Sequence, residues 1–107
     1  MRKGERTKSA ILNQAVSAAS RHGIEGLSIG SLADRLEMSK SGLFAHFGSK
    51  EDLQIAVLST AAAKFEEVVV RPALRAPRGA ARLRKWFDLW LRWITDPSIP
   101  GGCLFWI

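Results

Sequence analysis

The residue types that could bind an anionic surface gather in two short segments of the N-terminal half. One segment begins at Ser28 and the other at Ser39, and serine is a favoured residue immediately before a helix. The second segment opens with Ser39-Lys40-Ser41-Gly42, which combines two hydroxyls, one ammonium group and one residue without a side chain. Hydroxyl and ammonium groups can bind phosphate or the edge of a base, and glycine lets a backbone approach closely.

Two short helices joined by a tight turn over residues 28–47 form a helix-turn-helix pattern. In this pattern the first helix braces across the DNA backbone, and the start of the second helix enters the major groove. The free backbone amides that follow Ser28 and Ser49 offer further phosphate sites. We therefore expect residues 28–47 to bind double-stranded DNA.

The elements that position these segments are expected to be helices, because apolar residues recur with helical spacing and no strand alternation stands out. The segment Lys8–His22 has one apolar face, with Thr7 as its expected cap and Gly23 as its end. The two short helices are expected over Ser28–Leu36, with Ser28 as the cap, and Lys40–Phe47. The predicted fold class is all-α.

A longer helix is expected from Glu51 to about Val70, capped by Ser49 and ended by Pro72 and Pro77. Its inner side is predicted to hold Leu53, Val57, Leu58, Ala61, Phe65, Val68 and Val69. A last helix, Ala80–Thr95, has apolar residues over roughly 200° of its circumference. One neighbour cannot cover so wide a face, so we expect this helix to lie centrally between several partners.

Composition excludes several classes of protein. The 107 residues, 47% of them hydrophobic and 24% charged, suit a compact globular domain. No apolar run is long enough to span a bilayer, and no signal peptide is expected after the basic first residues. The lone Cys103 can form neither an internal disulfide nor a cysteine-based metal site, so the cytoplasm is the expected compartment.

The charge balance favours an anionic partner. The chain has 16 Lys and Arg against 10 Asp and Glu, a net charge of +6. Residues 1–50 hold eight of the cations and four of the acids, and residues 51–107 hold eight and six. Basic excess of this kind is typical of proteins that bind nucleic acid, and it points to the N-terminal half.

The sequence over about Thr7 to Phe65 resembles the DNA-binding domain of the TetR family of transcriptional regulators. The resemblance rests on three runs in order: Leu27-Ser28-Ile29-Gly30-Ser31-Leu32-Ala33-Asp34-Arg35-Leu36, Met38-Ser39-Lys40-Ser41-Gly42-Leu43-Phe44-Ala45-His46-Phe47, and Ser49-Lys50-Glu51-Asp52-Leu53. Two residues depart from the family pattern. Phe44 stands where tyrosine is usual, so a phenolic hydrogen bond to phosphate is unavailable, and Met38 replaces a small aliphatic residue.

The resemblance implies DNA contacts from Ser28, Ser39, Lys40, Ser41, Phe44, His46 and Lys50, with Gly42 beside them. It also implies a homodimer on a near-palindromic operator, a small-molecule effector, and repression that the effector relieves. Residues 5–65 would form the DNA-binding domain. Residues 66–107 would begin a C-terminal regulatory and dimerisation domain that is incomplete here, since the chain stops within the apolar run Phe105-Trp106-Ile107.

Plainer interpretations stand beside these assignments. The three serines Ser28, Ser39 and Ser49 could serve only as helix caps, and Phe44 could simply belong to the core. The two lysines could be solvated surface charges and His46 a surface residue without a role. Trp86 and Trp90 are candidates for the lining of an effector pocket, although aromatic residues at helical spacing are more often core. Cys103 fits a buried, inert thiol better than a redox sensor.

Two other functional classes compete with DNA binding. An enzyme is disfavoured, because His22, His46 and Cys103 form neither a nucleophile–base–orienter set nor a metal-ligand spacing. No cofactor or metal is expected. A membrane-surface protein could use the basic, Trp-rich segment 82–94, with Arg82, Arg84, Lys85 and Arg92 beside an apolar face. Binding to duplex DNA without turnover, or binding to liposomes, separates the three classes; no membrane partner is expected.

Overall fold

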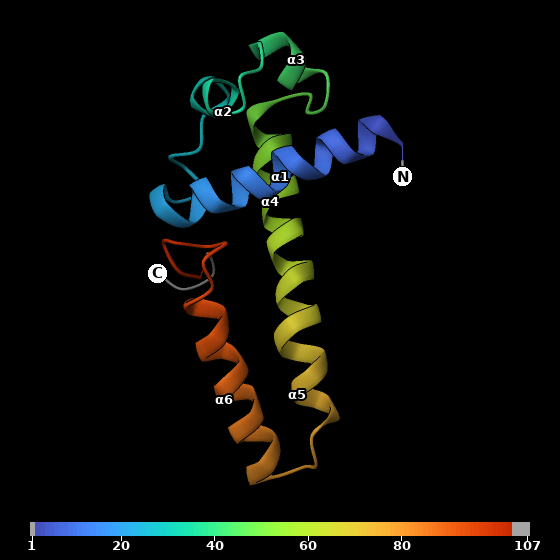
Figure 1. The fold of residues 1–107 in the computed structure, drawn as a ribbon, viewed down its shortest axis with the longest axis vertical. Helices are drawn as coiled ribbons and strands as arrows, with labels where there is room; N and C mark the ends of the chain where they lie inside the picture. Colours follow the sequence, from blue (N-terminus) through green and yellow to red (C-terminus); the bar gives the residue numbers. More distant parts are fainter. Residues whose placement is uncertain (1, 104–107) are drawn as a thin grey trace.

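The computed structural model describes residues 2–103, and these form helices without any strand (Figure 1). The elements are α1 (Lys3–His22), α2 (Ile29–Arg35), α3 (Lys40–Phe44), α4 (Lys50–Phe65), a π-helical segment (Glu66–Val70), α5 (Arg71–Arg75) and α6 (Ala80–Ile94). The predicted all-α class is confirmed. The molecule is elongated, with extents of 51 × 30 × 21 Å. None of the helices in the described part is long and apolar enough to cross a membrane.

The crossing of α1 over α4 forms the core of the upper part of the molecule (Figure 1). The predicted apolar face of α1 is confirmed, since Ile11, Ala15, Val16 and Ala19 are buried there. From α2, α3 and α4, the same core receives Ile29, Leu32, Ala33, Leu43, Leu53, Val57 and Ala61. Burial of these side chains holds the two short helices against the two long ones.

Helix α1 begins earlier than the apolar pattern indicates. It starts at Lys3, and Arg2 precedes it without a side-chain cap. The prediction of Thr7 as the cap is wrong: its hydroxyl donates to the carbonyl of Lys3 at 3.0 Å, inside the helix. The first turn is polar and exposed, so hydrophobic periodicity gives no signal there. The predicted end at Gly23 is confirmed, with φ at +78°.

The long helix continues through Pro72 instead of ending before it. Between α4 and α5 the hydrogen-bond pattern widens, and the N–H of Arg71 donates to the carbonyl of Glu66, five residues back. Pro72 then occupies the first turn of α5, where the N–H that proline lacks is not needed. The predicted break at Pro72 is therefore wrong, and the helical rod extends to Arg75.

Two residues assigned to the inner side of this rod lie outside. Leu53, Val57, Ala61 and Val69 are buried as predicted, but Leu58 is 37% exposed and Val68 is 39% exposed. Leu58 is exposed because α1 packs against only one side of α4. Val68 borders an open hollow with Leu89 and Arg92 of α6.

Helix α6 runs back along the lower rod (Figure 1). Its predicted extent is confirmed to within one residue, and its central position between several partners stays a prediction. It packs against α5 and the π-helical segment, and Trp93 is its one fully buried residue, stacked edge-on against Phe65 at 5.3 Å. Leu83 and Phe87 are 73% and 55% exposed.

After α6 the chain turns back to the end of α1. Asp96 accepts two hydrogen bonds of 2.8 Å at Oδ1, from the N–H and the hydroxyl of Ser98. These two bonds lower the pKa of Asp96. Burial acts in the opposite direction and raises this pKa, and the positive charge of Lys64 lowers it further. The turn buries Ile99 and places the Gly101 N–H on the Ser20 hydroxyl at 3.1 Å. A Cβ at Gly101 would collide with the Ser20 carbonyl, so this contact requires glycine.

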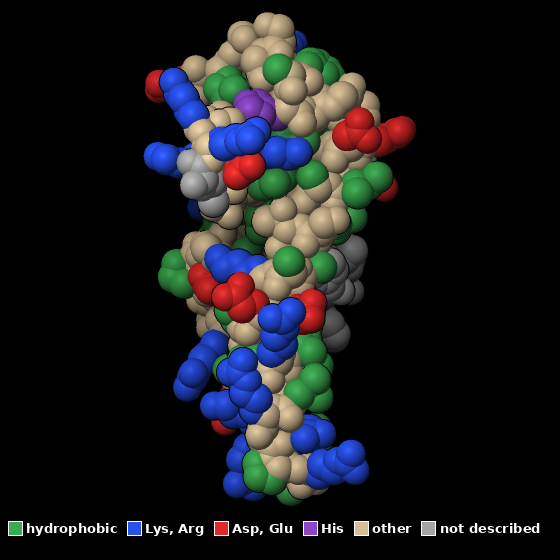
Figure 2. All heavy atoms as spheres, turned by 90° about the vertical axis from the view of Figure 1, so that its right-hand side faces the viewer, with side chains coloured by type: hydrophobic (Ala, Val, Ile, Leu, Met, Phe, Trp, Pro, Cys, Tyr) green, Lys and Arg blue, Asp and Glu red, His purple; other side chains and the backbone are tan. Residues whose placement is uncertain are grey.

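The basic side chains form two groups on the face shown in Figure 2. Lys and Arg side chains gather in the upper part, over the start of α1, and again at the lower end, around α5 and α6 (Figure 2). The lower group includes Arg75, Arg78 and Arg84, all exposed. Positive charge therefore lies at both ends of the elongated molecule.

The two leucines Leu53 and Leu58 test the packing of α4 with the same chemical change. Leu53→Ala empties a fully buried position and should lower the free energy of unfolding by about 2–5 kcal/mol. Leu58→Ala removes a side chain that is 37% exposed and should cost less than half as much. Urea denaturation measures both, and equal losses would contradict the packing described for α4.

A second prediction concerns the turn at Asp96. Because its folded pKa lies below 3.8, the carboxylate stabilises the fold above that value, and the contribution is lost as the pH falls through the folded pKa. Asp96→Ala should lower the free energy of unfolding at pH 7 by about 1 kcal/mol. In urea titrations, the difference from the unmodified chain should shrink as the pH falls below 3.8. A difference that stays constant with pH would contradict the role of the charge.

Candidate nucleic-acid interface

The α2–α3 pair forms the helix-turn-helix that the sequence predicts. Helix α2 ends at Arg35, and the Met38 N–H donates back to the Ala33 carbonyl at 2.9 Å, which closes the turn tightly. Glu37 occupies the left-handed region with φ at +55°. This region favours glycine, so the turn holds Glu37 in a conformation that its own side chain disfavours.

The three predicted caps are confirmed. The hydroxyl of Ser28 accepts from the Ser31 N–H at 3.1 Å, that of Ser39 from the Gly42 N–H at 3.0 Å, and that of Ser49 from the Asp52 N–H at 3.1 Å. Each cap satisfies a backbone donor that the first turn of a helix leaves free. Capping occupies one acceptor position of each hydroxyl, and all three residues stay at least partly exposed.

The start of α3 concentrates small polar groups at the surface. Ser39 and Ser41 are exposed, and their hydroxyl oxygens lie 3.2 Å apart. A Cβ at Gly42 would lie 3.1 Å from the Ser39 hydroxyl oxygen, closer than most real contacts. Gly42 therefore gives the cap the room it needs, which is a structural reason for glycine at this position beside the expected approach to DNA.

Lys40 is exposed at the first position of α3, and its side chain lies back toward α2. A Cβ on Gly30 would be 3.4 Å from Lys40 Cε and 3.7 Å from Nζ. Gly30 thus leaves space for the lysine at the junction of the two helices. The sequence pattern contains Gly30, but spacing along the chain could not show that it faces Lys40.

The far end of α3 presents an aromatic ring to solvent. Phe44 is 46% exposed, so the alternative that places it in the core is wrong. Leu43 and Phe47 beside it are 0% and 3% exposed and anchor the helix, which ends at Phe44 rather than at the predicted Phe47. His46 is half-buried, with its ring centroid 6.4 Å from that of Phe47.

Lys50 is exposed at the first position of α4, one residue after the Ser49 cap. The turn at Gly48 links this position directly to the end of α3. The residues of α3 and Lys50 thus lie on neighbouring elements, and Ser28 directly precedes α2.

Sequence reasoning missed two contributors to this region. Ser31 completes the cap of α2, because its hydroxyl accepts from that of Ser28 at 2.8 Å. Lys8 of α1 places its ammonium nitrogen 5.4 Å from the ring centroid of Phe47. The signal for Ser31 was the three-residue spacing from Ser28, whereas the Lys8 contact joins residues 39 positions apart and had no local signal.

The two candidate pocket residues lie on α6, away from α3. Trp86 is 37% exposed and lines a shallow hollow with Gly79, Arg82 and Leu83. Trp90 is half-buried and packs against the hydrophobic core. The third tryptophan of the helix, Trp93, is buried with its indole N–H unpaired. Cys103 is half-buried, and Trp106 lies outside the described residues.

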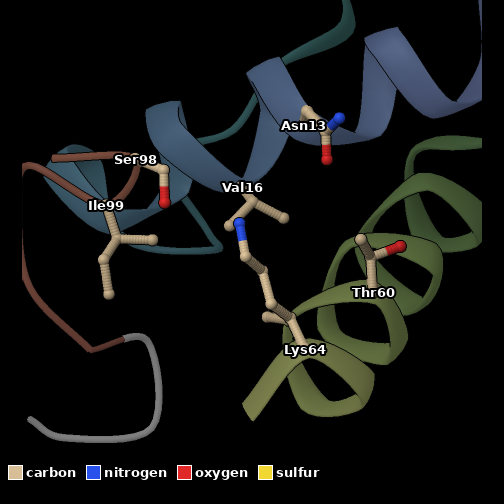
Figure 3. A pocket seen from close by; sticks show the side chains of 7 residues that line it. Asn13, Val16, Thr60, Lys64, Ser98 and Ile99 are labelled. Atoms are coloured by element: carbon tan, nitrogen blue, oxygen red, sulfur yellow. The ribbon is translucent and has the colours of Figure 1, made fainter. Parts of the chain in front are cut away.

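A separate hollow of about 240 Å³ opens between α1, α4 and the turn at Ser98 (Figure 3). Polar groups of Asn13, Thr60, Lys64 and Ser98 line it together with Val16 and Ile99. The Lys64 side chain reaches toward Val16 across the hollow (Figure 3). Within residues 2–103, no group of three or more His, Cys, Asp or Glu is placed to hold a metal ion.

Helices α2 and α3 and the tight turn between them have the geometry of a helix-turn-helix. Residues 11–57 match the family model of the bacterial regulatory proteins of the tetR family. Residues 11–57 therefore resemble the N-terminal domain that this family model describes.

A solved structure agrees with this assignment. A TetR transcriptional regulator from Chloroflexus aurantiacus J-10-FL superposes with a TM-score of 0.77 at 27% sequence identity. The match covers 97% of this chain and 52% of that one, so the chain spans about half of its length. A comparison with curated proteins found no match.

Two neighbouring serines test the structural part of the α3 start. Ser39→Ala removes the cap and should lower the free energy of unfolding by about 1 kcal/mol. Ser41→Ala removes a hydroxyl that caps nothing and should change it by less than about 0.5 kcal/mol. Thermal and urea denaturation measure both variants. A similar loss at both positions would show that the Ser39 cap is not what holds the first turn.

Proposed function

We propose that this chain is a sequence-specific transcriptional regulator, and that it represses its target genes until a small-molecule effector releases it from the operator. The observation that carries the proposal is the outward side of α3. Lys40, Ser41 and Phe44 are exposed there, while Leu43 holds the same short helix in the core. A rigidly seated helix with exposed polar and aromatic groups suits insertion into a major groove.

The proposed DNA contacts are Ser28, Ser39, Lys40, Ser41, Gly42, Phe44, His46 and Lys50. In this assignment Ser28 and Lys50 bind phosphate, because each stands at the start of a helix that flanks α3. Lys40 reads the edge of a guanine or binds phosphate, and the Phe44 ring packs against sugar or a thymine methyl group.

We further propose that the regulator acts as a homodimer on a near-palindromic operator in the cytoplasm. Dimeric helix-turn-helix proteins bind two half-sites about 34 Å apart, one turn of DNA. The protein would act by binding alone, without enzymatic turnover, cofactor or membrane partner.

Residues 66–107 are proposed to begin the regulatory and dimerisation domain, after a DNA-binding domain over 5–65. The exposed apolar residues of α6 support this division, because Leu83 and Phe87 offer a face that further helices could cover. Trp86 and Trp90 are proposed to line the effector pocket. They lie one turn apart on α6, and Trp86 already borders a hollow.

Selection of bound sequences from a random pool of duplex DNA tests the proposed function directly. The expected result is enrichment of a sequence with two inverted half-sites. Uniform recovery of all sequences would contradict sequence-specific binding, and recovery of none would exclude DNA binding.

Lys40 provides the residue-level test. Lys40→Ala should weaken binding to the selected operator by about 1–3 kcal/mol if the lysine reads a base, and should relax the preference at that position. If it binds only phosphate, the loss should be similar for all sequences. Lys85→Ala, which removes an exposed lysine from α6, is the matched control and should leave the affinity unchanged. An unchanged affinity for Lys40→Ala would remove this residue from the interface.

A further inference from the structure

The helix-turn-helix itself carries no net charge. Within residues 28–47 the two cations Arg35 and Lys40 are balanced by the two acids Asp34 and Glu37. Binding of a protein to duplex DNA depends strongly on Lys and Arg that neutralise phosphates and release counterions. Because the helix-turn-helix is neutral, cations from another part of the fold are needed to bind the phosphates of the DNA backbone.

A basic cluster at the start of α1 has the required charge. It consists of Arg2, Lys3, Arg6 and Lys8, with Glu5 as the one acid among them. All four cations are exposed. Positive side chains in the first turn oppose the helix dipole, so this placement does not stabilise α1. Helix α4 shows the favourable arrangement, with Glu51 and Asp52 in its first turn.

The position of the cluster matches the interface. The Lys8 ammonium nitrogen lies 5.4 Å from the ring centroid of Phe47, which follows α3 and is buried beneath it. The cluster therefore lies beside the end of α3 that carries Phe44. In Figure 2, Lys and Arg side chains gather next to a histidine over the start of α1. The end of α5 and the start of α6, which carry the other basic group, lie at the opposite end of the molecule from α3 (Figure 1).

We propose that this basic cluster binds the phosphates of the DNA strand that borders the groove entered by α3. From Arg2 to Lys8 the helix advances about 9 Å, which corresponds to the rise of two or three phosphates along one strand. These contacts supply affinity that does not depend on sequence, while α3 supplies the preference among sequences. The inference rests on the proposed function, because it assumes that α3 faces duplex DNA.

The test compares two triple variants with the same change in charge. Arg2→Gln, Lys3→Gln and Arg6→Gln together neutralise most of the cluster and leave the Lys8 contact in place. Arg75→Gln, Arg78→Gln and Arg84→Gln remove three exposed cations at the opposite end. Affinity of the full 107-residue chain for the selected operator and for a scrambled duplex is measured between 50 and 200 mM salt, and circular dichroism verifies that both variants fold.

The α1 variant should show a slope of log affinity against log salt that is shallower by about 0.9 for each phosphate that the variant no longer neutralises. It should weaken binding to both duplexes by the same factor, and the control variant should keep the original slope. An unchanged slope in the α1 variant, or an equal change in both variants, would overturn the inference while operator binding by the unmodified chain still supports the proposed function. If the unmodified chain binds neither duplex, the proposed function itself is wrong.

Discussion

The structure depends on the burial of two side chains that flank the exposed end of α3. A helix of five residues has almost no stability of its own, because it closes too few hydrogen bonds to offset the entropy of ordering the backbone. Burial of Leu43 and Phe47 in the core that α1 and α4 form supplies the stability that the short helix lacks. Phe44, between them in sequence, is then forced outward into solvent. The same packing that stabilises α3 thus decides which of its residues face solvent.

The caps connect stability and binding in the same small region. Ser39 uses one acceptor position for the Gly42 N–H, and the absence of a side chain at Gly42 makes that bond possible. The Ser39 hydroxyl also lies at the surface, within hydrogen-bond distance of the Ser41 hydroxyl and next to Lys40 in sequence. A change at Ser39 should therefore alter both folding and the proposed DNA contact, whereas a change at Ser41 should alter the proposed contact alone.

The lower half of the molecule is held by a smaller set of interactions. Helix α6 packs against the rod through the contact of Trp93 with Phe65. The turn at Asp96 connects the end of α6 to α1, because Ile99 is buried there and the Gly101 N–H donates to Ser20 of α1. The π-helical segment before Pro72 lets the rod remain continuous while its buried face shifts to meet α6. Two basic groups at opposite ends give the elongated molecule a charge distribution that net charge alone does not reveal.

The sequence by itself determined the local features of this protein: most of the helix positions, the three serine caps, the turn between α2 and α3, and the resemblance of residues 11–57 to a known family of regulators. These follow from short-range periodicity and from residue types with strong positional preferences. Only the tertiary structure decided that Phe44 and Leu58 are exposed, that the rod continues through Pro72, that α6 packs against α5 and the π-helical segment, and that Lys8 lies beside Phe47. Each of these depends on which neighbour covers a given face, and a pattern along one chain cannot specify how many neighbours a helix has.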